Sequence, residues 1–236
     1  MHIKLLVMSK ESVVISIGGS ILIPDEDDAV YIGKLSKMLL KVSKTVKLAV
    51  ICGGGKIARY YANTGRDLGG NEDQLDLLGI GATRLNAGLL ALSLGSASST
   101  DIPTDVDTAA ERSASVDILV MGGTKPGHTT DAVAAMLAKE MHAARVVNAT
   151  SVDAVYSADP RMDPNAVRYD TMTVDQLGDL VYKDHGAGKS SVFDPLGVKI
   201  AKKEHIDIMM VDGRDLDDLE KAILGKPFSG TFVNSH

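Results

Sequence analysis

The sequence is poor in cysteine and in aromatic residues, and this excludes several classes of protein. It has one cysteine, Cys52, so an intramolecular disulfide framework is excluded and a reducing compartment is indicated. Tryptophan is absent and aromatic residues make up only 4%, which leaves little for the stacking platforms that bind single-stranded nucleic acid. No apolar run reaches membrane-spanning length. The composition therefore favours a globular protein that does not span a membrane.

Charge and histidine spacing exclude further classes. The formal net charge is −6 and no basic stripe is present, which argues against DNA or RNA binding. The first fourteen residues hold a short apolar patch, but Lys10 and Glu11 interrupt it and no A-x-A-like cleavage site follows. The six histidines lack the close spacing of metal ligands, so we predict no structural metal site. We expect a cytoplasmic protein without nucleic-acid or membrane partners.

Short apolar runs alternate with amphipathic stretches along the whole chain. This alternation predicts an α/β fold with a mostly parallel sheet that helices cover on both faces. The hydrophobic content of 44% can supply one large core, and no repeat or linker divides the 236 residues, so residues 1–236 are expected to form a single domain. The main predicted strands are 13–18, 48–52, 116–121, 145–149, 206–211 and 231–233.

Three glycine-rich loops follow predicted strands. They are Gly18-Gly19-Ser20, the triple glycine at 53–55, and MGGTKPGHTTDA at 121–132. Ligands of parallel sheets bind at the carboxyl ends of the strands, so we expect all three loops at one edge. The third loop leads into a helix that starts near Thr130. Its glycines, threonines and helix N-terminus offer N–H and hydroxyl donors, which suits a phosphate.

Two common phosphate-binding motifs fit poorly. Gly188-Lys189-Ser190 matches the end of a P-loop, but Lys183 stands where the first glycine is required. The dinucleotide pattern GxGxxA fits 53–58, yet the acidic residue expected about twenty positions later falls at the start of a helix, at Asp73 or Asp76. An oxidoreductase is therefore disfavoured.

Six segments in order resemble archaeal-type uridylate (UMP) kinases of the amino acid kinase family. They are VVISIGGSIL, VICGGGKIAR, LLGIGATRLNA, VMGGTKPGHTTDAVAA, TSVDAVYSADPRMDP and SSVFDPLGVKIA. The resemblance implies an α/β/α sandwich with the acceptor toward the N-terminal half and ATP toward the C-terminal half. It also implies transfer of the γ-phosphate of ATP to UMP with Mg²⁺, in pyrimidine nucleotide biosynthesis. Members are usually hexamers, so a homohexamer, a trimer of dimers, is expected.

The resemblance assigns site residues one by one. The residues expected to bind ATP are Gly18, Gly19, Ser20, Gly55, Arg59, Thr150, Tyr156 and Asp159. Those expected to bind UMP are Gly54, Asp76, Thr124, Lys125, Pro126, Gly127, His128, Thr129 and Thr130. Asp131, in the first turn of the following helix, is expected to organise the cations around the transferring phosphoryl group.

One departure concerns charge. Many family members carry a lysine where this chain has Ser16, although archaeal-type members tend to lack it. We expect another cation to act in catalysis and favour Lys56, which follows the triple glycine, over Lys125 and Lys189. The UMP phosphate attacks directly, so phosphoryl transfer requires positioning and charge neutralisation rather than a nucleophilic side chain. Accordingly, the sequence shows no convincing Ser-His-Asp or Cys-His arrangement.

Two other functions remain open at this level. One is a kinase for another small acceptor, such as acetylglutamate, carbamate or isopentenyl phosphate. The other is an oligomer that binds nucleotide or oxyanion without turnover. Asp76 and the loop PGHTT favour UMP, while Asp131 and Lys56 favour catalysis. For assembly, the helix at 30–42 carries apolar residues on more than one face, which predicts a dimer contact there.

Overall fold

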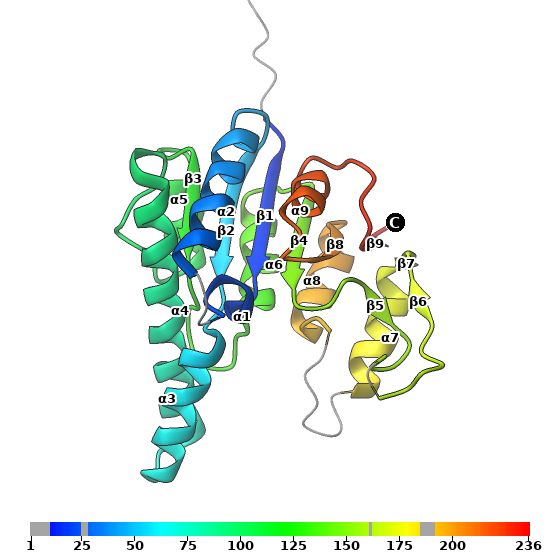
Figure 1. The fold of residues 1–236 in the computed structure, drawn as a ribbon, viewed down its shortest axis with the longest axis horizontal. Helices are drawn as coiled ribbons and strands as arrows, with labels where there is room; N and C mark the ends of the chain where they lie inside the picture. Colours follow the sequence, from blue (N-terminus) through cyan, green and yellow to red (C-terminus); the bar gives the residue numbers. More distant parts are fainter. Residues whose placement is uncertain (1–9, 25–27, 161, 185–191) are drawn as a thin grey trace, which may run out of the picture.

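The computed structural model describes residues 10–24, 28–160, 162–184 and 192–236. A seven-stranded sheet with the order β3-β2-β1-β4-β8-β9-β7 forms its centre (Figure 1). The first five of these strands are parallel, β9 runs antiparallel to β8, and β7 is parallel to β9. The bounds are β1 Ser12–Ile17, β2 Lys47–Cys52, β3 Ile118–Met121, β4 Arg145–Thr150, β7 Thr171–Thr173, β8 Asp207–Asp212 and β9 Thr231–Asn234. The mostly parallel sheet predicted from the sequence is confirmed.

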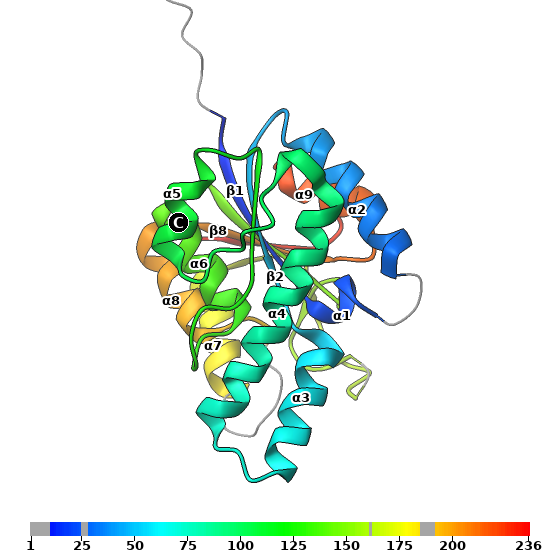
Figure 2. The same cartoon turned by 90° about the vertical axis from the view of Figure 1, so that its left-hand side faces the viewer.

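Helices cover both faces of the sheet, so the fold is an α/β/α sandwich (Figures 1 and 2). One core lies under α2 (Asp28–Val42), α4 (Glu72–Leu94) and α9 (Leu216–Ile223). The other lies under α5 (Val106–Ser113), α6 (Thr130–Glu140), α7 (Val174–Asp184) and α8 (Pro195–Glu204). Because both faces are covered, the central strands are apolar almost throughout.

The two-residue period of the strands sends a few polar side chains into this interior. In β1, Val13, Ile15 and Ile17 belong to the first core and Val14 to the second. Ser16 therefore shares the face of Val14, toward α6. In β4, Asn148 shares a face with Val146 in the same way. Both polar residues are buried near the carboxyl ends of their strands.

Two helices begin at residues whose types are typical of helix starts. Thr173 and Gln176 make the reciprocal hydrogen bonds of a capping box at the start of α7. Asp194 caps α8, with proline at the first helical position. Five short elements were not predicted: α1 (Gly19–Leu22), the 3-10 helix η1 (Gly95–Ala97), β7, and the two-stranded sheet of β5 (Val155–Tyr156) and β6 (Arg168–Tyr169).

Helices α3 (Gly55–Asp67) and α4 form a hairpin that projects beyond the sheet in both views (Figures 1 and 2). By length and composition alone, the helical stretch Glu72–Ala97 could cross a membrane. However, 44% of its apolar window is buried within the chain, and it packs against α2, α3 and β3. These contacts are those of a core helix. Its apolar stretch is nevertheless longer than expected, since the sequence alone indicated no apolar run of membrane-spanning length.

Most apolar side chains of α2 are covered by the chain itself. Leu35, Met38, Leu39 and Val42 are buried against α4 and α9, and the Tyr31 hydroxyl donates to Gly213 O at 2.6 Å. The excess of apolar residues that suggested a dimer contact at 30–42 is therefore explained by internal packing. Val30 of α2 is exposed, but the larger group of exposed leucines lies on α4: Leu77, Leu78, Leu85, Leu89 and Leu92.

Candidate functional site

The glycine turns after β1 and β2 pack backbone against backbone. Gly18 N donates to Ala149 O at 2.9 Å, and Gly53 N donates to Ile17 O at 2.8 Å. A Cβ atom on Gly19 would lie 2.1 Å from Gly55 N, so no side chain fits there. Gly55 has φ +60°, a conformation that favours glycine, and opens α3. The turns thus bring the N-terminus of a thirteen-residue helix to the sheet edge, where its N–H groups suit an anion.

Asp131 lies beside these turns, between the ends of β1 and β4. Its Oδ1 accepts a hydrogen bond from Ser16 Oγ at 2.8 Å, and the Asn148 side chain also bonds to it. Burial raises the pKa of Asp131 to about 6, and the charge of Asp194 adds to this rise, against the lowering effect of the two hydrogen bonds. A carboxyl group shifted this far, next in the chain to the pocket-lining residues Thr129 and Thr130, is a candidate functional group.

The start of α6 is tied to the start of α8. Thr129 Oγ1 accepts from Ala132 N at 3.2 Å and donates to Asp194 Oδ2 at 2.7 Å. Asp194 Oδ1 in turn accepts from Leu196 N at 2.7 Å. Since a hydroxyl has one proton, Thr129 cannot donate to a ligand while it holds Asp194. Of Thr129 and Thr130, both expected at UMP, Thr130 is therefore the better placed as a donor.

A pocket of about 280 Å³ lies between α3, α4 and the loop before α6. It brings together six of the predicted site residues, namely Arg59, Asp76, Lys125, His128, Thr129 and Thr130. Asp76 Oδ2 accepts from Gly127 N at 2.8 Å, so the carboxylate on α4 also fixes the loop. Arg59, expected at ATP, faces the same pocket as Asp76. Pro126 lies in this loop, next to Gly127.

Two side chains of α4 hydrogen-bond to the loop before α6. Arg84 Nε donates to Gly123 O at 3.1 Å, and its Nη2 donates to Thr124 O at 2.9 Å. Gly123 N donates to Thr83 Oγ1 at 2.6 Å. Sequence reasoning did not single out Thr83 or Arg84. The available signal was their place, as two adjacent polar residues, within the mostly apolar part of this helix.

The residues expected at the nucleotide end of ATP lie farther along the same edge. Thr150 ends β4, and Tyr156 lies in β5 with its hydroxyl donating to the Asp153 carboxylate at 3.1 Å. The carbonyl oxygen of Asp159 accepts from Asp163 N at 2.9 Å in a turn. Ser20 follows the first glycine pair in α1, and Gly54 precedes α3. The structure therefore separates a Thr150–Tyr156 side from the Asp76 pocket.

The candidate catalytic lysines lie apart. Lys56 Nζ donates to Pro24 O at 2.9 Å, and Lys125 lines the Asp76 pocket. Lys189 lies outside the described residues. No cluster of three or more His, Cys, Asp or Glu side chains that could hold a metal ion occurs within the described part of the chain.

Comparisons with known proteins find a matching family model and relatives that are named uridylate kinases. The model of the amino acid kinase family matches residues 11–212. A uridylate kinase from Methanococcoides burtonii is 42% identical over 213 residues, which cover 90% of this chain and 91% of that protein. A uridylate kinase from Thermococcus onnurineus is 41% identical over 222 residues, covering 94% of this chain and 98% of the relative.

Solved structures agree with the sequence relatives. The crystal structure of uridylate kinase from Archaeoglobus fulgidus matches with a TM-score of 0.84 at 40% identity, covering 94% of this chain and 99% of that chain. The structure of UMP kinase from Bacillus anthracis matches with a TM-score of 0.77 at 18% identity, covering 96% and 97%. The second likeness shows the fold alone.

Proposed function

The chain belongs to the amino acid kinase family, and on that premise we propose that it is a uridylate kinase, which transfers the γ-phosphate of ATP to UMP and releases ADP and UDP. The observation that carries this proposal is the pocket that gathers Arg59, Asp76, Lys125 and Thr130 beside two interlocked glycine turns. The activity would contribute UDP to pyrimidine nucleotide biosynthesis. An assay with a panel of acceptors tests it, as designed at the end of the Discussion.

In the proposed reaction, UMP occupies the Asp76 pocket in the N-terminal half of a single domain. The Asp76 carboxylate already accepts from Gly127 N, and its remaining lone pairs can accept from ribose hydroxyls. Arg59 and Lys125 supply positive charge for the UMP phosphate, and Thr130 supplies a donor. These contacts would orient a phosphate oxygen toward the glycine turns for an in-line attack.

ATP occupies the remaining length of the edge, toward the C-terminal half. Backbone N–H groups of the glycine turns, around Gly19 and Gly55, would hold its phosphates, and Thr150, Tyr156 and Asp159 its nucleoside end. Mg²⁺ would enter with the ATP phosphates and neutralise part of their charge, as it does where one or two carboxylates and phosphates share its coordination. The chain's own part is to position both phosphates and to exclude water.

Lys56 is proposed to supply the charge that Ser16 cannot. Lys56 lies in the first turn of α3, directly after the glycine turn. Its ammonium group donates to Pro24 O, and we expect this group to leave Pro24 and bind the phosphates when ATP is present. We expect Lys56→Met to lower kcat on the order of a hundred-fold, as for loss of one preorganised donor. The KM for UMP should change far less, because the contact strengthens in the transition state. Steady-state kinetics with both substrates varied would measure this split.

Lys125→Met and Lys189→Met serve as comparisons for Lys56→Met. Turnover of the Lys56 variant within about twofold of the parent, together with a crippled Lys125 or Lys189 variant, would assign the charge elsewhere.

We propose that the protein is a cytoplasmic homohexamer, a trimer of dimers, and that α4 forms a contact between copies. Leu85 and Leu92 lie on the outer face of this helix and are 67% and 68% exposed. Together with Leu78 and Leu89 they form an apolar stripe, and such stripes mark association surfaces. Light scattering at micromolar protein should give a hexameric mass, and the double variant Leu85→Glu, Leu92→Glu should give a smaller one.

Val167→Glu is the matched control for assembly, since Val167 is also exposed but lies near β6. A monomeric mass for the parent, or an unchanged mass for the α4 variant, would rule out the proposed contact.

A further inference from the structure

The turn formed by Asp212, Gly213 and Arg214 braces the ATP side of the edge. It follows β8, whose last residue pairs with Thr150 at the end of β4. Gly213 N donates to Thr150 O at 2.8 Å. The preceding carbonyl of β4, Ala149 O, accepts from Gly18 N at 2.9 Å. The consecutive carbonyl groups of Ala149 and Thr150 therefore hydrogen-bond to the glycine turn at Gly18 and to the turn at Gly213.

Gly213 packs closely against residues next to the glycine turn Gly18-Gly19. A Cβ atom at this position would lie 2.8 Å from Ile21 Cγ2 and 3.2 Å from the Ala149 Cβ. Ile21 is buried in α1, which begins at Gly19. From the other side, the Tyr31 hydroxyl of α2 donates to Gly213 O at 2.6 Å. Burial raises the pKa of Tyr31 well above its ordinary range, with a smaller effect from Asp212, so this phenol stays a neutral donor.

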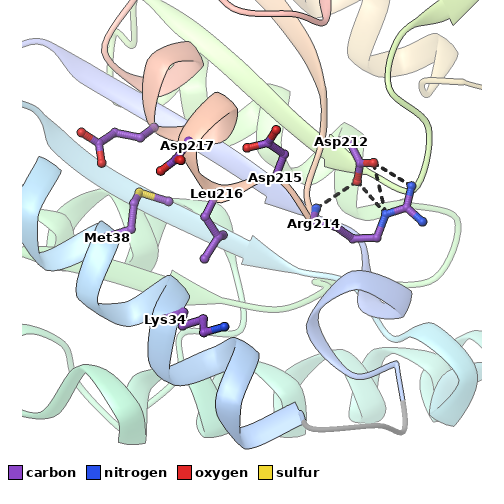
Figure 3. A pocket seen from close by; sticks show the side chains of 8 residues that line it. Lys34, Met38, Asp212, Arg214, Asp215, Leu216 and Asp217 are labelled. Atoms are coloured by element: carbon purple, nitrogen blue, oxygen red, sulfur yellow. Dashed lines mark hydrogen bonds and ion pairs between the residues drawn. The ribbon is translucent and has the colours of Figure 1, made fainter.

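Arg214 extends the brace to the loop beyond β4. Its Nε donates to Asp212 Oδ1 at 2.8 Å and its Nη2 to Oδ2 at 2.6 Å, so the ion pair is bidentate (Figure 3). The same Nη2 donates to Ser151 O at 3.1 Å. The hydrogen bonds from Arg214 hold the pKa of the Asp212 carboxyl below its usual range. With its head fixed by Asp212, the guanidinium meets Ser151 O in a defined orientation.

Ser151 begins the segment that carries Tyr156 and Asp159. Within this segment, Asp153 accepts from the Tyr156 hydroxyl and also interacts electrostatically with Arg214. Arg214 thus touches the segment at its first residue and attracts a carboxylate two residues later. Displacement of Ser151 would shift every later residue of the ATP side relative to Gly18 and Gly19.

We propose that Arg214 is a positioning residue for ATP: it sets the place of 150–159 relative to the glycine turns without touching the substrate. The inference rests on the proposed function, because it takes 150–159 as the part that binds the nucleoside end of ATP. It predicts a defect confined to one substrate. Loss of Arg214 should weaken ATP binding and leave UMP binding, on the far side of the glycine turns, unchanged.

The test compares Arg214→Met with Lys34→Met. Both residues line the same open hollow of about 720 Å³ between α2 and α9 (Figure 3), so both changes remove one positive charge from the same surface. We expect Arg214→Met to raise the KM for ATP about tenfold, as for loss of a charge-assisted hydrogen bond. The KM for UMP should stay within about twofold and Tm within about 2 °C, since the side chain of Arg214 is 64% exposed and such pairs add little stability.

Several outcomes would overturn the proposal. One is an unchanged KM for ATP in Arg214→Met, and another is an equal rise in Lys34→Met, which would show a general effect of charge. If Arg214→Met does not fold, Arg214→Lys replaces it: a lysine cannot hold the Asp212 fork and Ser151 together, so a rise is again expected and its absence counts against us.

Direct titration of each protein with ATP separates this inference from the proposed function. If the parent binds ATP but does not phosphorylate UMP, the proposed function fails. The inference is then still decided by whether Arg214→Met weakens the measured Kd for ATP while Lys34→Met does not.

Discussion

Replacing Asp131 with asparagine should lower kcat by roughly ten- to a thousand-fold, the range expected when electrostatic preorganisation is damaged. The fold and most of the affinity for UMP should survive. Asparagine has nearly the same shape, and its Oδ1 can still accept from Ser16 Oγ, which donates to Asp131 at 2.8 Å. What is lost is the negative charge beside the glycine turns, which we expect to organise the cations of the transferring phosphoryl group. Steady-state kinetics and UMP titration measure the two effects separately.

The same variant has a pH signature that needs no substrate. Burial raises the pKa of Asp131 to about 6, whereas an unfolded chain gives an aspartate about 3.9. Between these values the folded protein keeps a proton that the unfolded chain has released, so the contribution of Asp131 to stability falls as pH rises through this window. The asparagine side chain of the variant does not titrate. The unfolding free energy of Asp131→Asn minus that of the parent should therefore increase from about pH 4 to about pH 6.

Two results would contradict this view of Asp131. Near-normal turnover of the variant would leave only a favourable interaction of the carboxylate with the helix dipole of α6. If the difference in unfolding free energy does not change with pH, then burial does not raise the pKa of Asp131.

The Gly19→Ala variant should lose roughly a hundred- to a thousand-fold in kcat/KM for ATP. The new Cβ would lie 2.1 Å from Gly55 N and 2.6 Å from Gly53 O, and these are backbone atoms that cannot rotate away. The two glycine turns must therefore separate, and a displacement of about 1 Å at a reacting centre can cost about a hundred-fold. Overpacking also costs about 1–3 kcal/mol of stability, which should appear as a lower Tm.

Gly33→Ala is the matched control for this steric argument. Gly33 lies in α2, where an added Cβ meets no other described atom within 4 Å. The change should leave kinetics unaltered and slightly raise stability, because alanine is the better helix former. Wild-type kinetics in Gly19→Ala would show that the two turns do not need to touch.

Features set by local patterns could be predicted from the sequence. The parallel strands appear as apolar runs, and the caps at Thr173 and Asp194 follow from residue types at fixed spacing. Strands β5, β6 and β7 escaped prediction because two or three residues show no period. They exist through tertiary pairing, as where Thr231 Oγ1 donates to Tyr169 O far along the chain.

Side-chain direction was the part of the site that sequence could not supply. Spacing placed Lys56 beside the glycine turn, but the path of the chain after α1 decides that its ammonium meets Pro24 O. Arg59 was expected at ATP, yet the pairing of α3 with α4 turns it toward the Asp76 pocket. Arg84 donates a hydrogen bond to Thr124 O, 40 residues later in the chain, and no local sequence pattern predicts such a contact.

The most direct measurement of the central claim is ADP release by the purified protein with ATP and Mg²⁺, coupled to a panel of phosphate acceptors. The panel holds UMP, CMP, dUMP, acetylglutamate, carbamate and isopentenyl phosphate, with Asp131→Asn as the impaired control. We predict UDP formation from UMP at roughly 1–1,000 turnovers per second, with a higher kcat/KM than for any other acceptor. Absence of UDP from a folded protein that binds ATP, or a higher kcat/KM for a non-nucleotide acceptor, would contradict the assignment as a uridylate kinase.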